Sequence, residues 1–106
     1  MVSIKDFQNF ELIVAQIKEV KDHPNADKLY VLKVDTGTEE KQIVAGIRGS
    51  YAKEALIGRK VVIINNLEPA VLRGEESRGM ILAASDENGI SIIEPDHNMK
   101  IGSKVE

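Results

Sequence analysis

One run of apolar residues constrains the fold of this chain more than any other feature. Residues 59–65 read RKVVIIN, and Pro69 follows four residues later. Consecutive Val and Ile residues favour an extended backbone, and a short continuous apolar run is typical of a strand buried on both faces. Proline lacks the N–H that a strand needs, so Pro69 is expected to end this one. The run therefore predicts a buried strand and a core built around β-structure.

Three earlier segments share this apolar, β-branched composition. They are predicted as strands and cover residues 10–20, 29–35 and 41–45. The polar residues 22–27 contain Pro24 and favour a loop between the first two strands. Residues 36–40, TGTEE, favour a hairpin turn between the second strand and the third.

A short helix is predicted between the third strand and the buried strand. Residues 50–57 read SYAKEALI, with Ser50 placed as the N-cap and Gly58 just past the end. The remaining predicted pieces are extended residues 70–73, a polar turn at 74–77, extended residues 80–84, a hairpin turn at 86–89, extended residues 90–93 and a tail at 95–106.

The order of these elements predicts an all-β domain. Five strands with a short helix between the third and the fourth is the plan of an OB-fold barrel, followed here by a C-terminal β extension. Other small β-barrels share this spacing. A chain of 106 residues has the usual size of one domain. We therefore expect a single domain over residues 1–106, with 86–106 as its C-terminal extension.

Composition excludes several classes of protein. The chain has no cysteine, which excludes disulfides and thiolate metal sites and favours a reducing compartment. No apolar run approaches about 20 residues, so no membrane-spanning helix is expected. The first ten residues, MVSIKDFQNF, mix charged and apolar residues and do not resemble a signal peptide. We therefore expect a cytoplasmic protein.

Charge is distributed unevenly along the chain. The net charge of −3 argues against a protein that binds nucleic acid by bulk electrostatics alone. Residues 25–80 hold nine basic and eight acidic side chains, whereas residues 81–106 hold two basic and five acidic ones. A face that binds an anion is therefore expected in the middle of the chain.

Few side chains are suited to catalysis. His23 and His97 lie in polar loops, without the ligand spacing of a zinc site, and are interpreted as solvated loop residues. The glycines form no phosphate-binding loop, and the paired glutamates at 39–40 and 75–76 lie in predicted turns. We expect no catalytic residue, no metal and no cofactor, and hence no enzyme activity of its own.

Residues 65–80, NNLEPAVLRGEESRGM, are the most informative polar segment. Two interpretations remain open. In the first, the segment is a well-bonded turn on the rim of the barrel, where Asn66 caps backbone groups and Gly74 and Gly79 adopt unusual φ angles. In the second, four side chains form a cluster of donors for phosphates and base edges: Asn66, Arg73, Ser77 and Arg78.

Several motifs closely resemble the tRNA-binding domain family. They are HPNADKLYVLKVD at 23–35, QIVAGI at 42–47 and NLEPAVLRGEESRGMILAAS at 66–85. The opening IKDFQNFELIVAQIKEV is similar to the family's first strand, and the ending EPDHNMKIGSKVE resembles the tail of its methionyl-tRNA synthetase members. The family includes the C-terminal domain or beta subunit of those synthetases, free-standing tRNA-binding proteins and a cytokine precursor. The resemblance spans nearly the whole chain.

The resemblance implies an OB-fold, usually homodimeric, that binds tRNA by shape around the outer corner of the L. Such a module has no chemistry of its own and raises the tRNA affinity of methionyl-tRNA synthetase, whose catalytic domain it serves in cis or in trans. Lys28 is a weak match to the family's binding positions, and Arg48 lies where the binding face should continue. Four positions match more closely: Asn66, Arg73, Ser77 and Met80.

Two departures from the family pattern bear on affinity. The family often reads NLKPxKMRG, and here Glu68 and Val71 replace the two lysines. Each phosphate contact contributes roughly 0.7 to 0.9 to the salt slope of binding, so their loss is expected to weaken it. A weak accessory module fits this pattern, because a neighbouring catalytic domain raises its effective concentration. A relative that has drifted away from tRNA also fits.

The C-terminal extension carries more apolar side chains than the cap of a small barrel needs. They are Ile90, Ile92, Ile93, Ile101 and Val105. Packing against a second copy would bury them, and the alternative is that the tail folds back on its own barrel. A different function stays open on the same fold, a dimeric, chaperone-like module that binds extended peptides.

Overall fold

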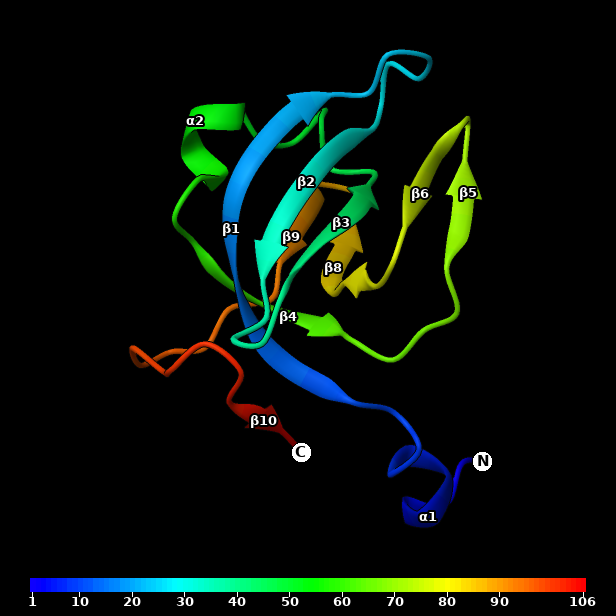
Figure 1. The fold of residues 1–106 in the computed structure, drawn as a ribbon, viewed down its shortest axis with the longest axis vertical. Helices are drawn as coiled ribbons and strands as arrows, with labels where there is room; N and C mark the ends of the chain where they lie inside the picture. The colour runs from blue at the N-terminus through cyan, green and yellow to red at the C-terminus, as the bar shows by residue number, and fades with distance from the viewer.

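Strand β1 (Leu12–Asp22) is the centre of the sheet in the computed structural model, which describes residues 1–106 (Figure 1). Its first half pairs antiparallel with β4 (Lys60–Ile64), and its second half with β2 (Tyr30–Asp35). A register shift between Ile17 and Glu19 separates the two halves. Such a bulge bends a strand, and here it lets one strand serve both sides of a curled sheet.

Three more strands complete this sheet. They are β3 (Glu40–Ala45) beside β2, β7 (Met80–Ile81) beside β4, and β10 (Lys104–Val105) beside the start of β1. The path β3-β2-β1-β4-β7 curls so that its two ends approach each other. The all-β, OB-like fold expected from the sequence is confirmed.

The core is almost entirely aliphatic. Residues 61–64 of β4 are all buried, as the run VVII predicted. Two of them, Val61 and Ile63, belong to the central cluster, to which β1, β2, β3, β9 and helix α2 also contribute: Ile13, Ala15, Ile17, Tyr30, Leu32, Val34, Ile43, Ile47, Leu56, Val61, Ile63 and Ile92.

Two hairpins extend from the barrel. The first joins β5 (Ala70–Leu72) to β6 (Glu75–Ser77), and the second joins β8 (Ala83–Asp86) to β9 (Gly89–Ile92), confirming the turn predicted at 86–89. The predicted polar turn at 74–77 is wrong in extent. Arg73 and Gly74 alone form the turn, both with positive φ as a two-residue hairpin requires, and residues 75–77 are strand.

The two helices are short. Helix α2 (Lys53–Leu56) begins later than predicted, and Ser50 is not its N-cap: Ala52 holds that place without a side-chain hydrogen bond. Burial of Leu56 fixes this helix in place of a cap. Helix α1 (Ile4–Phe7) was not predicted, and it buries no residue. Neither helix is long and apolar enough to cross a membrane.

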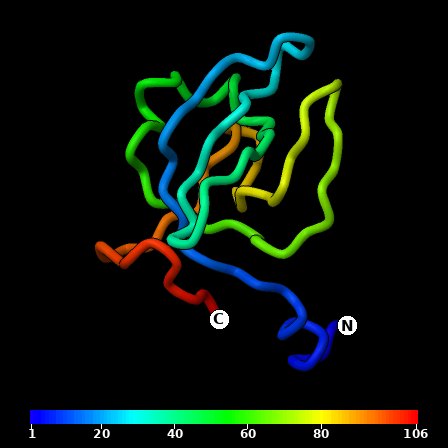
Figure 2. The backbone as a smooth tube through the Cα atoms, viewed as in Figure 1, coloured from blue at the N-terminus to red at the C-terminus, as the bar shows by residue number.

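The C-terminal segment folds back on its own barrel. Gly102 donates its N–H to Val14 O at 2.7 Å, and Val14 returns its N–H to Ser103 O at 2.9 Å. A side chain at position 102 would lie 3.1 Å from Thr36 O, and its φ of +91° also favours glycine. Both termini therefore lie at the same end of the molecule, opposite the β1–β2 loop (Figure 2).

Candidate functional site

The tip of the β5–β6 hairpin meets the loop between β1 and β2 at one end of the barrel. Arg73 occupies the tip with an exposed side chain. Its Nη2 donates to Asn25 O at 3.2 Å, and Asn25 Nδ2 donates back to Arg73 O at 3.4 Å. Lys28 lies in the same loop, exposed and without an ion pair or side-chain hydrogen bond. The structure therefore brings Arg73 and Lys28 to one rim.

Arg48 supports this loop from the side of β3. Its Nη1 donates to Ala26 O at 3.4 Å, and its Nη2 lies 3.4 Å from Asp22 Oδ2. Lys53 Nζ approaches the same carboxylate at 3.4 Å. Two cations share one anion here, so positive charge is left over on the rim defined by Lys28, Arg48, Lys53 and Arg73, which we term the cationic rim.

Arg78 lies apart from the cationic rim. It follows the base of the β5–β6 hairpin, where its backbone N–H donates to Gln42 O at 2.9 Å. Its side chain forms an ion pair with Glu39 at 3.6 Å, near the β2–β3 turn. The predicted donor cluster is therefore split between the two ends of the hairpin.

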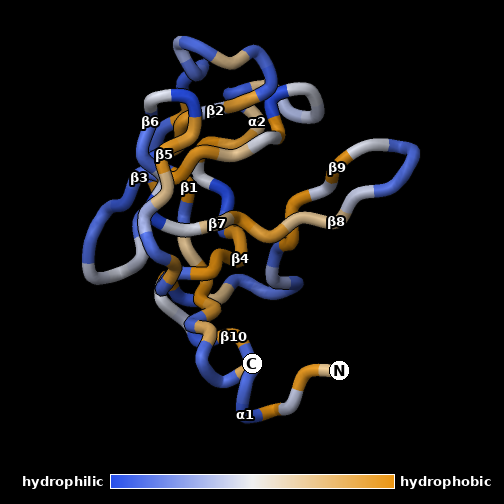
Figure 3. Tube along the Cα trace, turned by 90° about the vertical axis from the view of Figure 1, so that its right-hand side faces the viewer, coloured by the Kyte–Doolittle hydropathy of each residue, from blue (hydrophilic) through white to orange (hydrophobic).

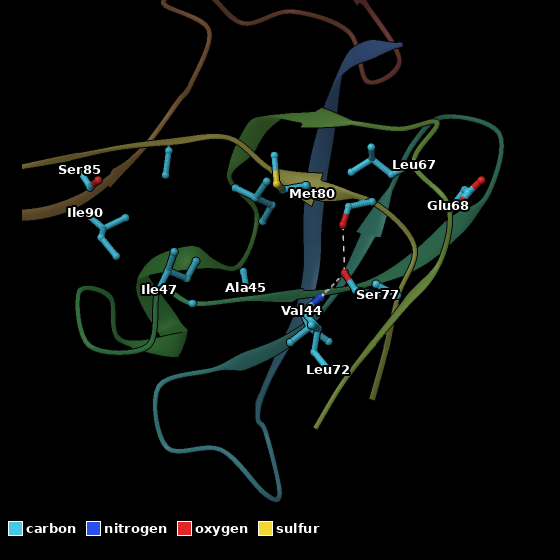
Figure 4. Close-up of a pocket in the computed structure, with 15 residues that line it drawn as sticks. Val44, Ala45, Ile47, Leu67, Glu68, Leu72, Ser77, Met80, Ser85 and Ile90 are labelled. Carbon is cyan, nitrogen blue, oxygen red and sulfur yellow. Dashed lines mark hydrogen bonds between the residues drawn. The ribbon is translucent and has the colours of Figure 1, made fainter. Parts of the chain in front are cut away.

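Ser77 is buried, with 5% of its surface exposed. Its Oγ accepts the N–H of Val44 and donates to Gly79 O, both at 3.0 Å (Figure 4). The hydroxyl is thus used inside the protein: its proton is bound by Gly79 O, and its oxygen joins β6 to β3 by accepting the N–H of Val44. Gly79 lets the backbone after β6 pass close to β4, because a Cβ at this position would lie 3.0 Å from Ile64 O, at a φ of +157°.

Asn66 is exposed, yet both ends of its amide bind backbone. Its Oδ1 accepts the N–H of Glu11, and its Nδ2 donates to Asn9 O, each at 2.8 Å. The interpretation of Asn66 as a residue that caps backbone groups is confirmed. The groups belong to the arm between α1 and β1, so Asn66 anchors that arm to the loop after β4.

Met80 is 46% exposed and lines an apolar groove beside β3 (Figure 4). The groove has a volume of about 450 Å³, and ten of its fifteen lining residues are hydrophobic. Glu68 is the one charged residue among them. The hydrophobic lining includes Val44, Ile47, Leu67, Leu72, Met80 and Ile90.

His23 is the residue that the sequence-based interpretation placed wrongly. It was expected to be solvated, but only 3% of its surface is exposed. Its Nε2 lies 2.8 Å from Leu72 O, and its Nδ1 accepts the N–H of Asn25 at 2.9 Å. Leu72 is 49 residues away from His23 in the sequence, so the residues around His23 could not predict this hydrogen bond. His97, by contrast, is exposed, and no group of three or more potential metal ligands is present.

Comparison with known proteins relates this chain to a known family. The model of the tRNA binding domain family matches residues 12–104. A methionine–tRNA ligase of Thermococcus onnurineus is 51% identical over 104 residues, which are 98% of this chain and 14% of that protein. The chain thus spans about one seventh of the length of such curated relatives.

Solved structures share the fold over the full chain. A MetRS related protein from Pyrococcus horikoshii superposes with a TM-score of 0.92 at 32% identity, covering 100% of this chain and 98% of that one. The CsaA chaperone protein from Picrophilus torridus superposes with a TM-score of 0.93 at 30% identity, covering both chains completely.

The hydrogen bonds of Ser77 lead to a prediction about stability. Ser77→Ala removes the hydroxyl and leaves the buried N–H of Val44 without an acceptor, so the free energy of unfolding is expected to fall by about 1–3 kcal/mol. Urea denaturation measures it. Ser91→Ala, in an exposed position of β9, is the control and is expected to change stability by less than about 0.5 kcal/mol. A Ser77→Ala variant as stable as its parent would contradict the structural role.

Proposed function

Because the chain belongs to the tRNA-binding domain family, we propose that it is a non-catalytic module that binds tRNA by shape and raises the tRNA affinity of methionyl-tRNA synthetase. It is a tRNA-binding domain related to one part of methionine–tRNA ligases. The catalytic domain acts beside it in cis or in trans, and both work in the cytoplasm.

The observation that carries this proposal is the cationic rim. Arg73 and Lys28 are exposed there, and Arg48 and Lys53 together face a single carboxylate, Asp22. Exposed ion pairs contribute little, so these cations exchange Asp22 for phosphate at small cost. Phosphate contacts fix the register of a nucleic acid on a protein.

The other predicted residues take two kinds of role in this proposal. Asn66 and Ser77 shape the frame, because their polar atoms already bind backbone. Arg78 exchanges its exposed ion pair with Glu39 for a phosphate at the edge of the interface. Met80 offers a soft apolar surface to a ribose or a base.

We further propose that the chain forms a homodimer through its N-terminal arm and its C-terminal extension. Helix α1 buries nothing in its own barrel, and the N-terminal arm, residues 1–11, leaves five large apolar side chains exposed: Met1, Val2, Ile4, Phe7 and Phe10. Ile93 and Met99 are also exposed, whereas Ile92 is used in the barrel core. Figure 3 shows apolar residues along the arm, at the end that carries both termini. A dimer there leaves the cationic rim clear.

A second candidate function is binding of extended peptides. The apolar groove beside β3 and the likeness to a CsaA chaperone favour it. The groove is lined by aliphatic side chains such as Val44, Leu67 and Ile90, which suit apolar peptide side chains.

The first test replaces Arg73 with Ala. Loss of one phosphate contact is expected to weaken tRNA binding and to lower the slope of log affinity against log salt by roughly 0.7 to 0.9. Filter binding at several salt concentrations measures both. Lys18→Ala is the control, because it removes the same charge from an exposed residue of β1 that forms no ion pair and lies outside the cationic rim and the proposed dimer segments. Equal effects of the two substitutions would show that only overall charge matters.

The second test concerns the dimer. Ile4→Asp places a charge on a side chain that is 79% exposed in the single chain, and it is expected to convert a dimer into a monomer that keeps the far-UV circular dichroism spectrum of the folded barrel. Analytical ultracentrifugation gives the mass. Ile57→Asp, at an exposed position after α2, is the control and is expected to remain dimeric. A monomeric parent protein would contradict the proposal.

The third test separates the two candidate functions. A fluorescent, unfolded apolar peptide is titrated with the chain, with and without tRNA. The tRNA-binding proposal expects saturable, salt-sensitive tRNA binding and at most weak peptide binding. Tight peptide binding in the absence of any tRNA binding would favour the chaperone-like function.

A further inference from the structure

The tip of the β5–β6 hairpin is attached to the barrel by few contacts. Its base is fastened to β3 by Ser77, by the backbone of Arg78 and by Gln42, whose Nε2 donates to Glu76 O at 2.9 Å. Residues 71–74 are exposed, and the strands on either side are three residues long. Outside the hairpin, only His23 and Asn25 form hydrogen bonds with these residues.

His23 is the one of these two that is buried. Its neighbours Asp22 and Pro24 are exposed, while its ring is enclosed between the loop and the hairpin. The backbone closes this loop, because His23 N–H donates to Leu29 O at 3.2 Å. The His23 ring therefore belongs to a hydrogen-bonded loop that joins β1 directly to β2.

The hydrogen bonds of His23 define its chemical form. Asn25 donates a backbone N–H to Nδ1, so Nδ1 carries no proton. Nε2 then carries the ring proton and donates it to Leu72 O. Neutral His23 in this tautomer joins the loop that holds Lys28 to the strand that leads into Arg73.

We propose that His23 is a positioning residue that holds the tip of the β5–β6 hairpin, and with it Arg73, in register with the β1–β2 loop. This inference rests on the proposed binding of tRNA at the cationic rim. Recognition by shape needs fixed distances between the contacting cations, and residues 71–74 at the hairpin tip bury no side chain that would fix them. Figure 1 shows the loop and the hairpin tip at the same end of the molecule.

Two substitutions separate the two hydrogen bonds of the ring. His23→Asn keeps an acceptor for the N–H of Asn25, in the manner of an Asx turn, and removes the donor to Leu72 O. His23→Gln places an amide N–H near the position of Nε2 and keeps that donor. His97→Asn, at an exposed histidine, is the matched control.

The first readout needs no tRNA. The ring ¹⁵N chemical shifts of His23 in the parent protein are expected to show a protonated Nε2 and an unprotonated Nδ1. Amide exchange in residues 71–76 is expected to accelerate in His23→Asn and to stay near the parent rate in His23→Gln. The opposite tautomer, or unchanged exchange in His23→Asn, would overturn the inference.

The second readout is tRNA binding at several salt concentrations. His23→Asn is expected to weaken binding between about threefold and tenfold. Its salt slope should equal that of the parent, because Arg73 still reaches its phosphate in the complex and only the cost of ordering the hairpin tip is added. His23→Gln and His97→Asn are expected to bind like the parent. A lowered salt slope in His23→Asn, or equal losses in His23→Asn and His23→Gln, would contradict a positioning role.

The two failures are distinguishable. If the parent protein binds no tRNA, the proposed function fails, while amide exchange still decides whether His23 holds the hairpin. If the parent binds tRNA and His23→Asn binds equally well, the proposed function stands and the positioning role fails.

Discussion

The division of β1 between two partner strands is the constraint on which the rest of the structure depends. Its first half pairs with β4 and its second half with β2, and the shift after Ile17 turns the strand between them. The inward side chains of both halves then meet in one aliphatic core. Since the sheet curls about this point, its ends at β3 and β7 come together. We term this junction the seam, and the β5–β6 hairpin precedes β7 and contacts β3 there.

At the seam, specific polar contacts replace a continuous ladder of strand pairing. The Ser77 hydroxyl joins β6 to β3, and the Arg78 N–H reaches Gln42 O. Gly79 lets the chain pass within contact distance of Ile64 O before β7 pairs with β4. Two residues that the sequence marked as possible contacts for RNA, Ser77 and Arg78, therefore help to close the barrel. Their polar character is explained by backbone groups that would otherwise be buried without partners.

The sequence predicted the strands well and the local details less well. The apolar runs at 29–35, 41–45 and 59–65 became β2, β3 and β4 within a residue at each end, because buried strands leave short runs of apolar, β-branched residues in the sequence. Helix α1 left no such signal, since it buries no residue. Ser50 was misplaced because Leu56, and not a cap, fixes helix α2.

The candidate site shows more clearly what could not be predicted from the sequence. Arg73 was singled out from the sequence, but the roles of its neighbours depend on partners far away in the chain. Asn66 binds the backbone 55 residues before it, Ser77 binds Val44 33 residues away, and His23 binds Leu72 at a separation of 49. A local pattern carries no information on such pairings, so a frame residue and a ligand-contacting residue look alike in the sequence.

The hydrogen bonds of Ser77, Asn66 and His23 also explain how a chain with a net charge of −3 is compatible with an anionic ligand. Glu68 and Val71 stand where the family often has lysine, which removes attraction but leaves the hydrogen bonds of Ser77, Asn66 and His23 in place. Attraction between charges acts at long range and decays with salt, whereas a fixed arrangement acts only on contact. On the proposed function, an interface of this kind would select shape and bind weakly on its own. Weak binding is sufficient for a module that is held beside a catalytic domain, because tethering supplies the effective concentration that charge does not.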